Sequence, residues 1–141
     1  MLRIILALSL VLFSFLPVSA EGPTDADRAA IKTVIMGQLD AFATDDPATA
    51  YGFAAPVVKG AFPDVEQFMA MVKGGYKPVY RNTARSYGDV FTDNTGRPAM
   101  RVVLTAEDGK RWEAIYAMQQ QPDSSWKIAG CVLLALAGQE V

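Results

Sequence analysis

The chain has 141 residues, of which 51% are hydrophobic and 20% charged, and its net charge at pH 7 is −2. That composition is typical of one globular domain, long enough to bury a core without disulfide or metal staples. A weakly acidic chain without a basic cluster is a poor nucleic-acid binder, so we expect no nucleic-acid partner.

Histidine is missing from the chain, and Cys131 is its one cysteine. Without histidine, the Ser-His-Asp and Cys-His catalytic arrangements and ordinary zinc sites are excluded. One cysteine allows no intrachain disulfide. The carboxylates in the predicted strands and turns lack metal-ligand spacing, so we expect neither a metal nor a cofactor.

Residues 1–20 have the pattern of a secretory signal peptide. Arg3 precedes the apolar run Ile4–Leu16, and small residues at Ser19 and Ala20 suit cleavage after Ala20. The run is shorter than the about 20 residues that a spanning helix needs, although an uncleaved N-terminal anchor is the alternative. No cysteine follows the run, which excludes a lipoprotein anchor. We therefore expect a periplasmic or secreted protein with no stable membrane anchor after cleavage, in which residues 21–141 form a single domain.

Two helices are predicted in the first part of that domain. Thr24 is a suitable cap for the first, which ends near Thr44. Its apolar side chains recur every three or four residues: Ile31, Val34, Ile35, Leu39 and Phe42. A short second helix is expected to begin at Pro47 and to be closed by Pro56, with a loop after it.

A third helix is predicted from Asp64, its cap, to the glycine pair Gly74 and Gly75. One of these glycines is expected to end the helix in the left-handed conformation. Pro78 is expected to hold Lys77 extended, so that the chain passes directly into the first strand.

Four strands follow, over residues 82–91, 97–106, 110–120 and 126–136. Strands this close in sequence form an antiparallel meander. Helices followed by hairpins predict an α+β fold, with the N-terminal helices packed on one face of a four-stranded antiparallel sheet. Residues 137–141 are expected to be a loose tail.

The hairpin at "AEDGK" allows its register to be predicted. A three-residue loop with a left-handed Gly109 places Leu104 opposite Trp112 and Met100 opposite Tyr116. A two-residue loop shifts the pairing by one and mixes apolar with charged side chains on each face. We therefore predict the three-residue loop.

The last strand, "IAGCVLLAL", is apolar on both faces. A strand with one buried face should alternate. The outer sheet face therefore needs a cover, and we expect a homodimer that packs through it. Whether Cys131 or Val132 lies beside Tyr116 depends on the length of the preceding turn and stays open.

Three stretches of the sequence together point to a family: "GYKPVYR" at Gly75–Arg81, "WEAIYAM" at Trp112–Met118 and "PDSSWKIAGC" at Pro122–Cys131. With "QLDAFATDD" and the signal peptide, the chain resembles the domain-of-unknown-function 4864 family (DUF4864) of small exported bacterial proteins. That family looks like a branch of the nuclear transport factor 2-like (NTF2-like), or cystatin-like, superfamily. The resemblance implies a cone-shaped fold with helices inside a bent sheet, but no activity and no catalytic residues. Ser124 stands where a glycine is common in the family's turn.

Aromatic side chains are the best candidates for lining a pocket. Tyr76 and Tyr80 are expected to enter the first strand. Hydroxyl and indole donors in an apolar wall are typical of small-ligand pockets. The alternative is that these aromatics fill the core and bond nearby backbone. The full candidate set is Tyr51, Tyr76, Tyr80, Trp112 and Tyr116.

Two functions follow from these patterns. The first is a non-catalytic periplasmic module that binds a small apolar or amphipathic ligand, or a partner protein. The alternative, which rests on fold analogy alone, is a cofactor-free isomerase, dehydratase or cyclase with a carboxylate base and tyrosine donors. Asp40 and Glu113 are the candidate acid/base residues, although Asp40 is expected to face solvent and Glu113 to pair diagonally with Arg101 on the outer sheet face.

Overall fold

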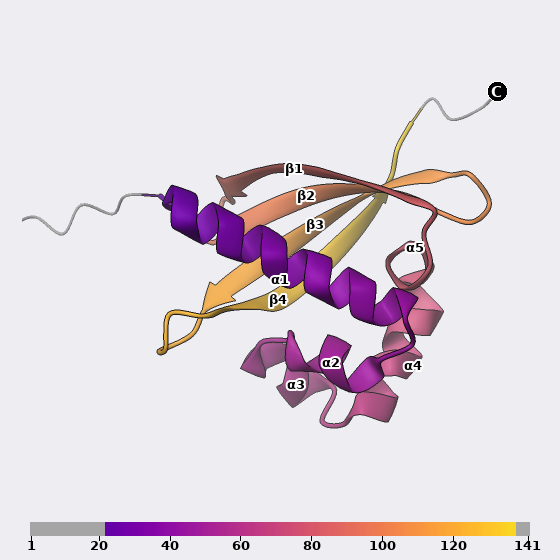
Figure 1. Cartoon of the computed structure of the whole chain (residues 1–141), viewed down its shortest axis with the longest axis horizontal. Helices are drawn as coiled ribbons and strands as arrows, with labels where there is room; N and C mark the ends of the chain where they lie inside the picture. Colours follow the sequence, from indigo (N-terminus) through magenta and orange to yellow (C-terminus); the bar gives the residue numbers. More distant parts are fainter. Residues whose placement is uncertain (1–21, 138–141) are drawn as a thin grey trace, which may run out of the picture.

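The structure is a computed structural model that describes residues 22–137. Helices come first and strands afterwards, in an α+β arrangement (Figure 1). The predicted signal peptide and residues 138–141 of the predicted tail lie outside the described residues. In chain order the elements are α1 (Asp25–Ala43), α2 (Pro47–Gly52), α3 (Pro56–Ala61), α4 (Val65–Gly75), α5 (Lys77–Tyr80), β1 (Ala84–Thr92), β2 (Pro98–Thr105), β3 (Arg111–Gln120) and β4 (Trp126–Ala135).

Helix α1 begins with a capping box that confirms the predicted cap. The Thr24 hydroxyl accepts from the Asp27 N–H at 3.1 Å, and the Thr24 N–H donates to the Asp27 carboxylate at 3.0 Å. The carboxylate also lies at the positive end of the helix dipole, and the pKa of Asp27 is lowered mainly by its bond from the Thr24 backbone. The apolar stripe is buried at Ile31, Ile35, Leu39 and Phe42.

Two arginines from outside α1 hold its C-terminal end. Arg81 donates to the Phe42 carbonyl at 2.7 Å, and Arg85 donates to the Leu39 carbonyl at 3.2 Å. The last turn of α1 has no basic residue of its own. These cations therefore supply the positive charge that stabilises a helix C-terminus.

The prediction for the segment after α2 is wrong at Pro56. Helix α2 begins at Pro47, as predicted, and Asp46 caps it, but the helix ends at Gly52, and Pro56 begins a further helix, α3. Proline suits the first turn of a helix as well as the residue after one. Between the two helices the chain bonds the edge strand β4: the Ala55 N–H donates to the Ile128 carbonyl at 2.8 Å, and the Ile128 N–H donates to the Phe53 carbonyl at 2.9 Å.

The junction after α4 also differs from the prediction. Asp64 caps α4 by accepting from the Gln67 N–H at 2.8 Å, which confirms the cap. Neither glycine at its end has a positive φ, and the residue that follows the helix as its C-cap is Tyr76, with φ −133°. Lys77 is not extended, since it begins the single turn α5, which the Arg81 N–H closes onto the Lys77 carbonyl. Proline disfavours helical backbone at the residue before it, here Lys77. The burial of Pro78 and Val79 by this turn outweighs that preference.

The sheet is an antiparallel meander in the order β1-β2-β3-β4. The predicted register between β2 and β3 is confirmed, with Leu104 opposite Trp112 and Met100 opposite Tyr116. Gly109 has φ +84°, as the three-residue loop requires. The diagonal pair is also present on the outer face, with Arg101 Nε 3.1 Å from the Glu113 carboxylate.

The open question of Cys131 is settled by a bulge. Met118 lies opposite Ile128 but Ala117 opposite Gly130, which leaves Ala129 as the extra residue. Beyond the bulge Tyr116 lies opposite Cys131, so these two side chains share the inner face of the sheet.

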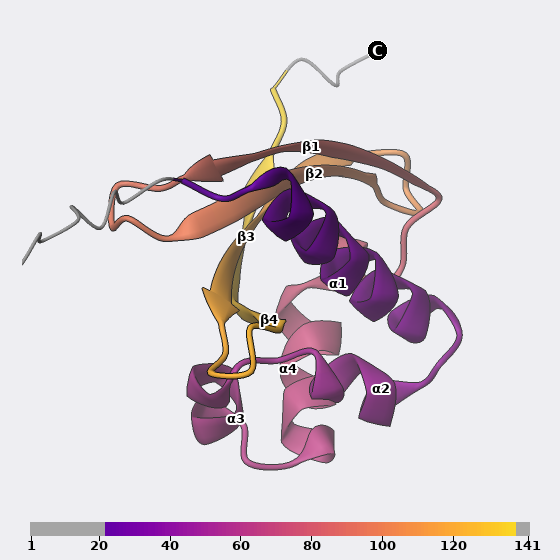
Figure 2. The ribbon, with the colours of Figure 1, turned by 60° about the vertical axis from the view of Figure 1, so that its left-hand side comes forward.

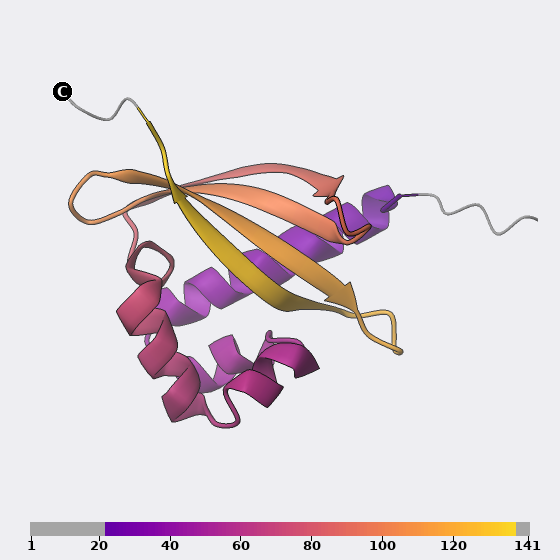
Figure 3. The same cartoon turned by 180° about the vertical axis from the view of Figure 1, so that it is seen from behind.

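The helices lie on one side of the sheet. Figure 2 shows α1 running across the concave face of the curved sheet, with α2, α3 and α4 on the β4 side of the sheet. Figure 3 shows the opposite face, which no helix of the described chain covers. Within residues 22–137, no helix has both the length and the apolar character needed to cross a bilayer.

Candidate ligand-binding pocket

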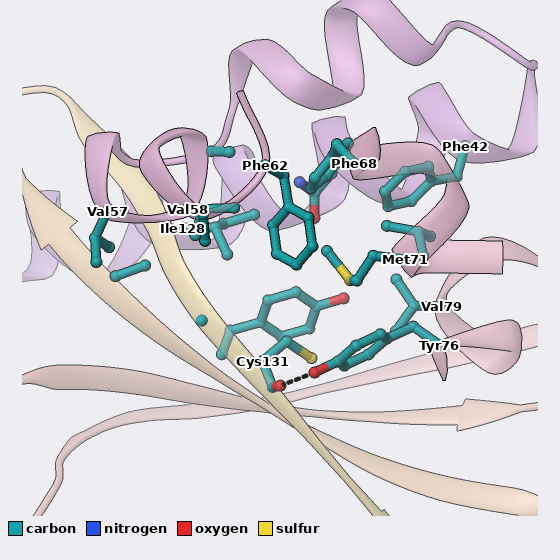
Figure 4. A pocket seen from close by; sticks show the side chains of 17 residues that line it. Phe42, Val57, Val58, Phe62, Phe68, Met71, Tyr76, Val79, Ile128 and Cys131 are labelled. Atoms are coloured by element: carbon teal, nitrogen blue, oxygen red, sulfur yellow. Dashed lines mark hydrogen bonds between the residues drawn. The ribbon is translucent and has the colours of Figure 1, made fainter. Parts of the chain in front are cut away.

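A pocket of about 370 Å³ opens between the short helices and the sheet. Its walls come from α1, α3, α4, the segment before α3, Val79 of α5 and the bulged part of β4 (Figure 4). Tyr116 of β3 contributes to the inner wall. The lining residues are Gln38, Phe42, Ala54, Val57, Val58, Ala61, Phe62, Phe68, Met71, Val72, Tyr76, Val79, Tyr116, Ile128, Ala129, Gly130 and Cys131.

The lining is apolar and carries no charged side chain among the described residues. Its polar side chains are Gln38, Tyr76, Tyr116 and Cys131. Gln38 is 4% exposed, and its amide nitrogen donates to the Ala50 carbonyl at 3.1 Å. That bond fixes the side chain between α1 and α2.

Tyr76 is held by the edge strand. Its hydroxyl donates to the Cys131 carbonyl at 3.0 Å, as the dashed line in Figure 4 marks. Partial burial, with a smaller contribution from Cys131, raises the pKa of Tyr76. The Tyr76 hydroxyl therefore stays protonated at neutral pH, and its proton is already donated to the Cys131 carbonyl.

Tyr116 differs from Tyr76 because its hydroxyl is enclosed and has no hydrogen-bond partner in the described chain. The side chain is 1% exposed, and burial raises the pKa of Tyr116 well above its ordinary value. The neighbouring Cys131 thiol contributes to that shift, but the contact does not have the geometry of a hydrogen bond. A buried hydroxyl left without a partner costs about 1–3 kcal/mol.

The Cys131 thiol is not activated. Although the residue keeps some solvent exposure, burial of the thiol raises its pKa to about 12, and the contact with Tyr116 only partly opposes this. A thiol with that pKa is protonated at neutral pH and a weak nucleophile.

The structure brings together two of the five aromatic residues that the sequence suggested, Tyr76 and Tyr116. Tyr51 is not among the lining residues, and its hydroxyl donates to the Phe62 carbonyl at 2.6 Å. Tyr80 lies at the end of α5 rather than in the first strand, and its hydroxyl donates to Asp45 at 3.1 Å. Trp112 is partly exposed on the inner face opposite Leu104, away from the pocket lining.

Neither candidate acid/base residue lines the pocket. The Asp40 carboxylate is 2.6 Å from Arg85, and its side chain is 68% exposed. The Glu113 carboxylate pairs with Arg101 on the outer sheet face. No group of three or more potential metal ligands occurs within residues 22–137.

Sequence reasoning missed several lining residues, among them Gln38, Phe62 and Met71. A signal for Gln38 was present, since it lies three residues after Ile35 and four before Phe42, on the apolar stripe of α1. A polar residue in such a stripe faces the interior. Phe62 and Met71 carried no comparable signal, because the docking of α3 and α4 decides where they point.

The fold and the pocket define a small α+β domain with an apolar cavity that no charged side chain of residues 22–137 lines. A family model, domain of unknown function (DUF4864), matches residues 24–141, so the chain belongs to the DUF4864 family. No curated protein matches the chain, and no solved structure does either.

Proposed function

We propose that this protein is a non-catalytic binding module that takes a small apolar or amphipathic ligand into the pocket. The observation that carries the proposal is a pocket of about 370 Å³ with an apolar lining and a few polar side chains. Small-ligand sites have volumes of about 300 Å³ upward and this kind of wall.

The enzyme alternative has less support. A carboxylate-dependent isomerase, dehydratase or cyclase needs its base within hydrogen-bond reach of the substrate. Asp40 and Glu113 are engaged by Arg85 and Arg101 outside the pocket, and the lining contributes no carboxylate.

We further propose that the domain is a branch of the NTF2-like, cystatin-like cone folds. Support comes from α1 crossing the concave face of a curved antiparallel sheet, with a pocket between the helices and the sheet (Figure 2). The pattern of residues 1–20 supports export to the periplasm. Periplasmic extraction followed by mass spectrometry should give a mature chain beginning at Glu21, and a cytoplasmic full-length chain would contradict export.

A homodimer through the outer sheet face is proposed as well. Val132 and Leu134 are 56% and 47% exposed there, on an edge strand. Light scattering should give a dimer for the natural chain and a monomer for Leu134→Asp. The matched control is Met36→Asp, which changes an exposed apolar residue of α1 and should stay dimeric. A natural chain that is monomeric at micromolar concentration would remove this proposal.

Binding itself is tested with the neutral fluorescent probe N-phenyl-1-naphthylamine. Ala61 is exposed at the pocket lining, so Ala61→Trp should fill the entrance and abolish saturable probe binding. Ala30→Trp makes the same change at an exposed site of α1 outside the pocket lining and should bind the probe normally. Equal binding by both variants would contradict the pocket as the site. Native mass spectrometry of the protein from its own periplasm would then report the retained ligand.

A further inference from the structure

We infer that the ligand is uncharged where it enters the pocket and presents a hydrogen-bond acceptor to the Tyr116 hydroxyl. The inference rests on the proposed binding function and names the class of ligand: a neutral amphiphile such as a long-chain ketone or ester, rather than a fatty carboxylate or an amine.

The uncharged lining of the pocket disfavours a charged ligand. The described part of the lining offers no cation to pair with a carboxylate and no anion to pair with an amine. An unpaired ion moved from water into such a wall is strongly disfavoured. The positive charge of Arg85 opposes the rise in the pKa of Tyr116. Its guanidinium, however, already donates to Asp40, Asn82 and the Leu39 carbonyl.

The acceptor requirement comes from the polar groups of the wall. The Gln38 amide and the Tyr76 hydroxyl donate to carbonyls at 3.1 Å and 3.0 Å. The Tyr116 hydroxyl is the buried side-chain oxygen that has no partner within residues 22–137. Because the phenol stays protonated at neutral pH, it offers a donor. A ligand oxygen that accepts from it would offset the cost of burying that donor unpaired.

The hydroxyl is enclosed in the ligand-free protein, so a ligand oxygen reaches it only when a lining side chain moves. Figure 4 shows Phe62 and Met71 extending into the pocket from the helical side. Met71 is partly exposed, and an unbranched thioether changes rotamer more easily than a ring. Displacement of Met71 is therefore the expected rearrangement on binding.

The test is displacement of N-phenyl-1-naphthylamine by three ligands of matched length at pH 8: 2-decanone, 1-decene and decanoate. The natural chain should bind 2-decanone about tenfold more tightly than the alkene or the carboxylate. Tyr116→Phe should lose that preference for the ketone over the alkene, when each affinity is corrected for the affinity of that variant for the fluorescent probe. Tyr80→Phe, which removes a hydroxyl outside this pocket, is the matched control and should behave like the natural chain.

The outcomes separate this inference from the proposed function. Saturable probe binding together with a ketone preference that survives Tyr116→Phe would overturn the role of the hydroxyl and leave the binding module standing. Decanoate binding more tightly than 2-decanone would overturn the neutral ligand. Absence of saturable binding for the probe and for all three ligands would overturn the binding module itself.

Discussion

The inner face of the sheet has two unlike regions. Beneath α1 it is closed, and Ile31, Ile35 and Leu39 of that helix have no solvent exposure. Beside α3 and α4 the same face borders a pocket of about 370 Å³. We call the part of the molecule beneath α1 the filled region, and the part beside α3 and α4 the hollow region.

The difference lies in the helices that cover the two regions. Helix α1 has 19 residues, a capping box and a continuous buried stripe. Helix α3 has six residues, no side-chain cap bond and no buried residue. A short helix of this kind forms a wall without filling the space behind it, and regions with little buried apolar surface are those that open for ligands. The filled region should thus set the stability of the protein, and the hollow region its binding.

The largest effect is expected from Leu39→Ala in the filled region. Leu39 is fully buried in the core cluster, and such truncations cost about 2–5 kcal/mol of unfolding free energy. Urea denaturation measures the loss. Val57→Ala at the pocket, where the side chain is 60% exposed, should change stability by less than about 0.5 kcal/mol. Comparable losses for the two variants would erase the distinction between the regions.

A sharper comparison lies within the hollow region, between two tyrosines. Tyr76→Phe removes a hydroxyl bonded to the Cys131 carbonyl and should cost about 1 kcal/mol. Tyr116→Phe removes an unpartnered hydroxyl and should leave stability unchanged or raise it by about 1 kcal/mol. Both are measured by urea denaturation on protein refolded without ligand, since a bound ligand would add its own stabilisation. A greater loss for Tyr116→Phe would mean that its hydroxyl is satisfied.

Much of the filled region could be predicted from the sequence, because it depends on local signals. Thr24 caps α1 as expected. The Gly109 turn fixed the β2–β3 register through one left-handed residue. Local rules suffice where a cap, a turn residue or a periodic stripe decides the outcome.

The hollow region was harder to predict because it depends on contacts between distant segments. Pro56 can end a helix or begin one, and the bonds of Phe53 and Ala55 to Ile128 select the second outcome. The facing of Cys131 depends on a bulge at Ala129 that no sequence pattern marks. The sequence proposed Tyr116 for the pocket, but only its surroundings show that its hydroxyl lacks a partner.

The strand that borders the hollow region follows a strained turn, which gives a smaller prediction. Ser124 has φ +70° in the β3–β4 hairpin, whereas Gly96 and Gly109 take the positive-φ positions of the other two hairpins. Ser124→Gly should raise stability by about 0.5–1 kcal/mol, because glycine adopts this conformation without strain. Its backbone bonds to Gln120 and Gln121 remain available.

Gly109→Ser is the matched control for that change, since it places the same side chain at the corresponding position of the β2–β3 hairpin. It should lower stability by about 1 kcal/mol. Thermal and urea denaturation of both variants test the pair. A loss for Ser124→Gly would show that the serine side chain stabilises the turn and outweighs the strain.

The smallest effect is expected where the C-terminal end of α1 meets α5. Arg81 lies 2.6 Å from the exposed Asp45 carboxylate. Hydrogen bonds from Arg81 and then Tyr80 lower the pKa of Asp45 below its ordinary value of 3.8. A carboxyl whose pKa is lowered by folding stabilises the protein above its unfolded pKa and loses that contribution as the pH falls through the folded value.

Asp45→Asn should therefore be less stable than the natural chain at pH 6, with the difference shrinking as the pH falls below about 4. Asparagine also tolerates the positive φ of +53° at this position, so the substitution adds little backbone strain. Urea midpoints between pH 2.5 and 7 measure the effect, and Arg81→Gln should weaken the same pH dependence from the other partner. Because neither side chain of the pair lines the pocket, neither variant should alter probe binding there. A change in probe affinity would instead show that the Arg81–Asp45 pair is coupled to the hollow region. Stability and binding would then not be set by separate regions.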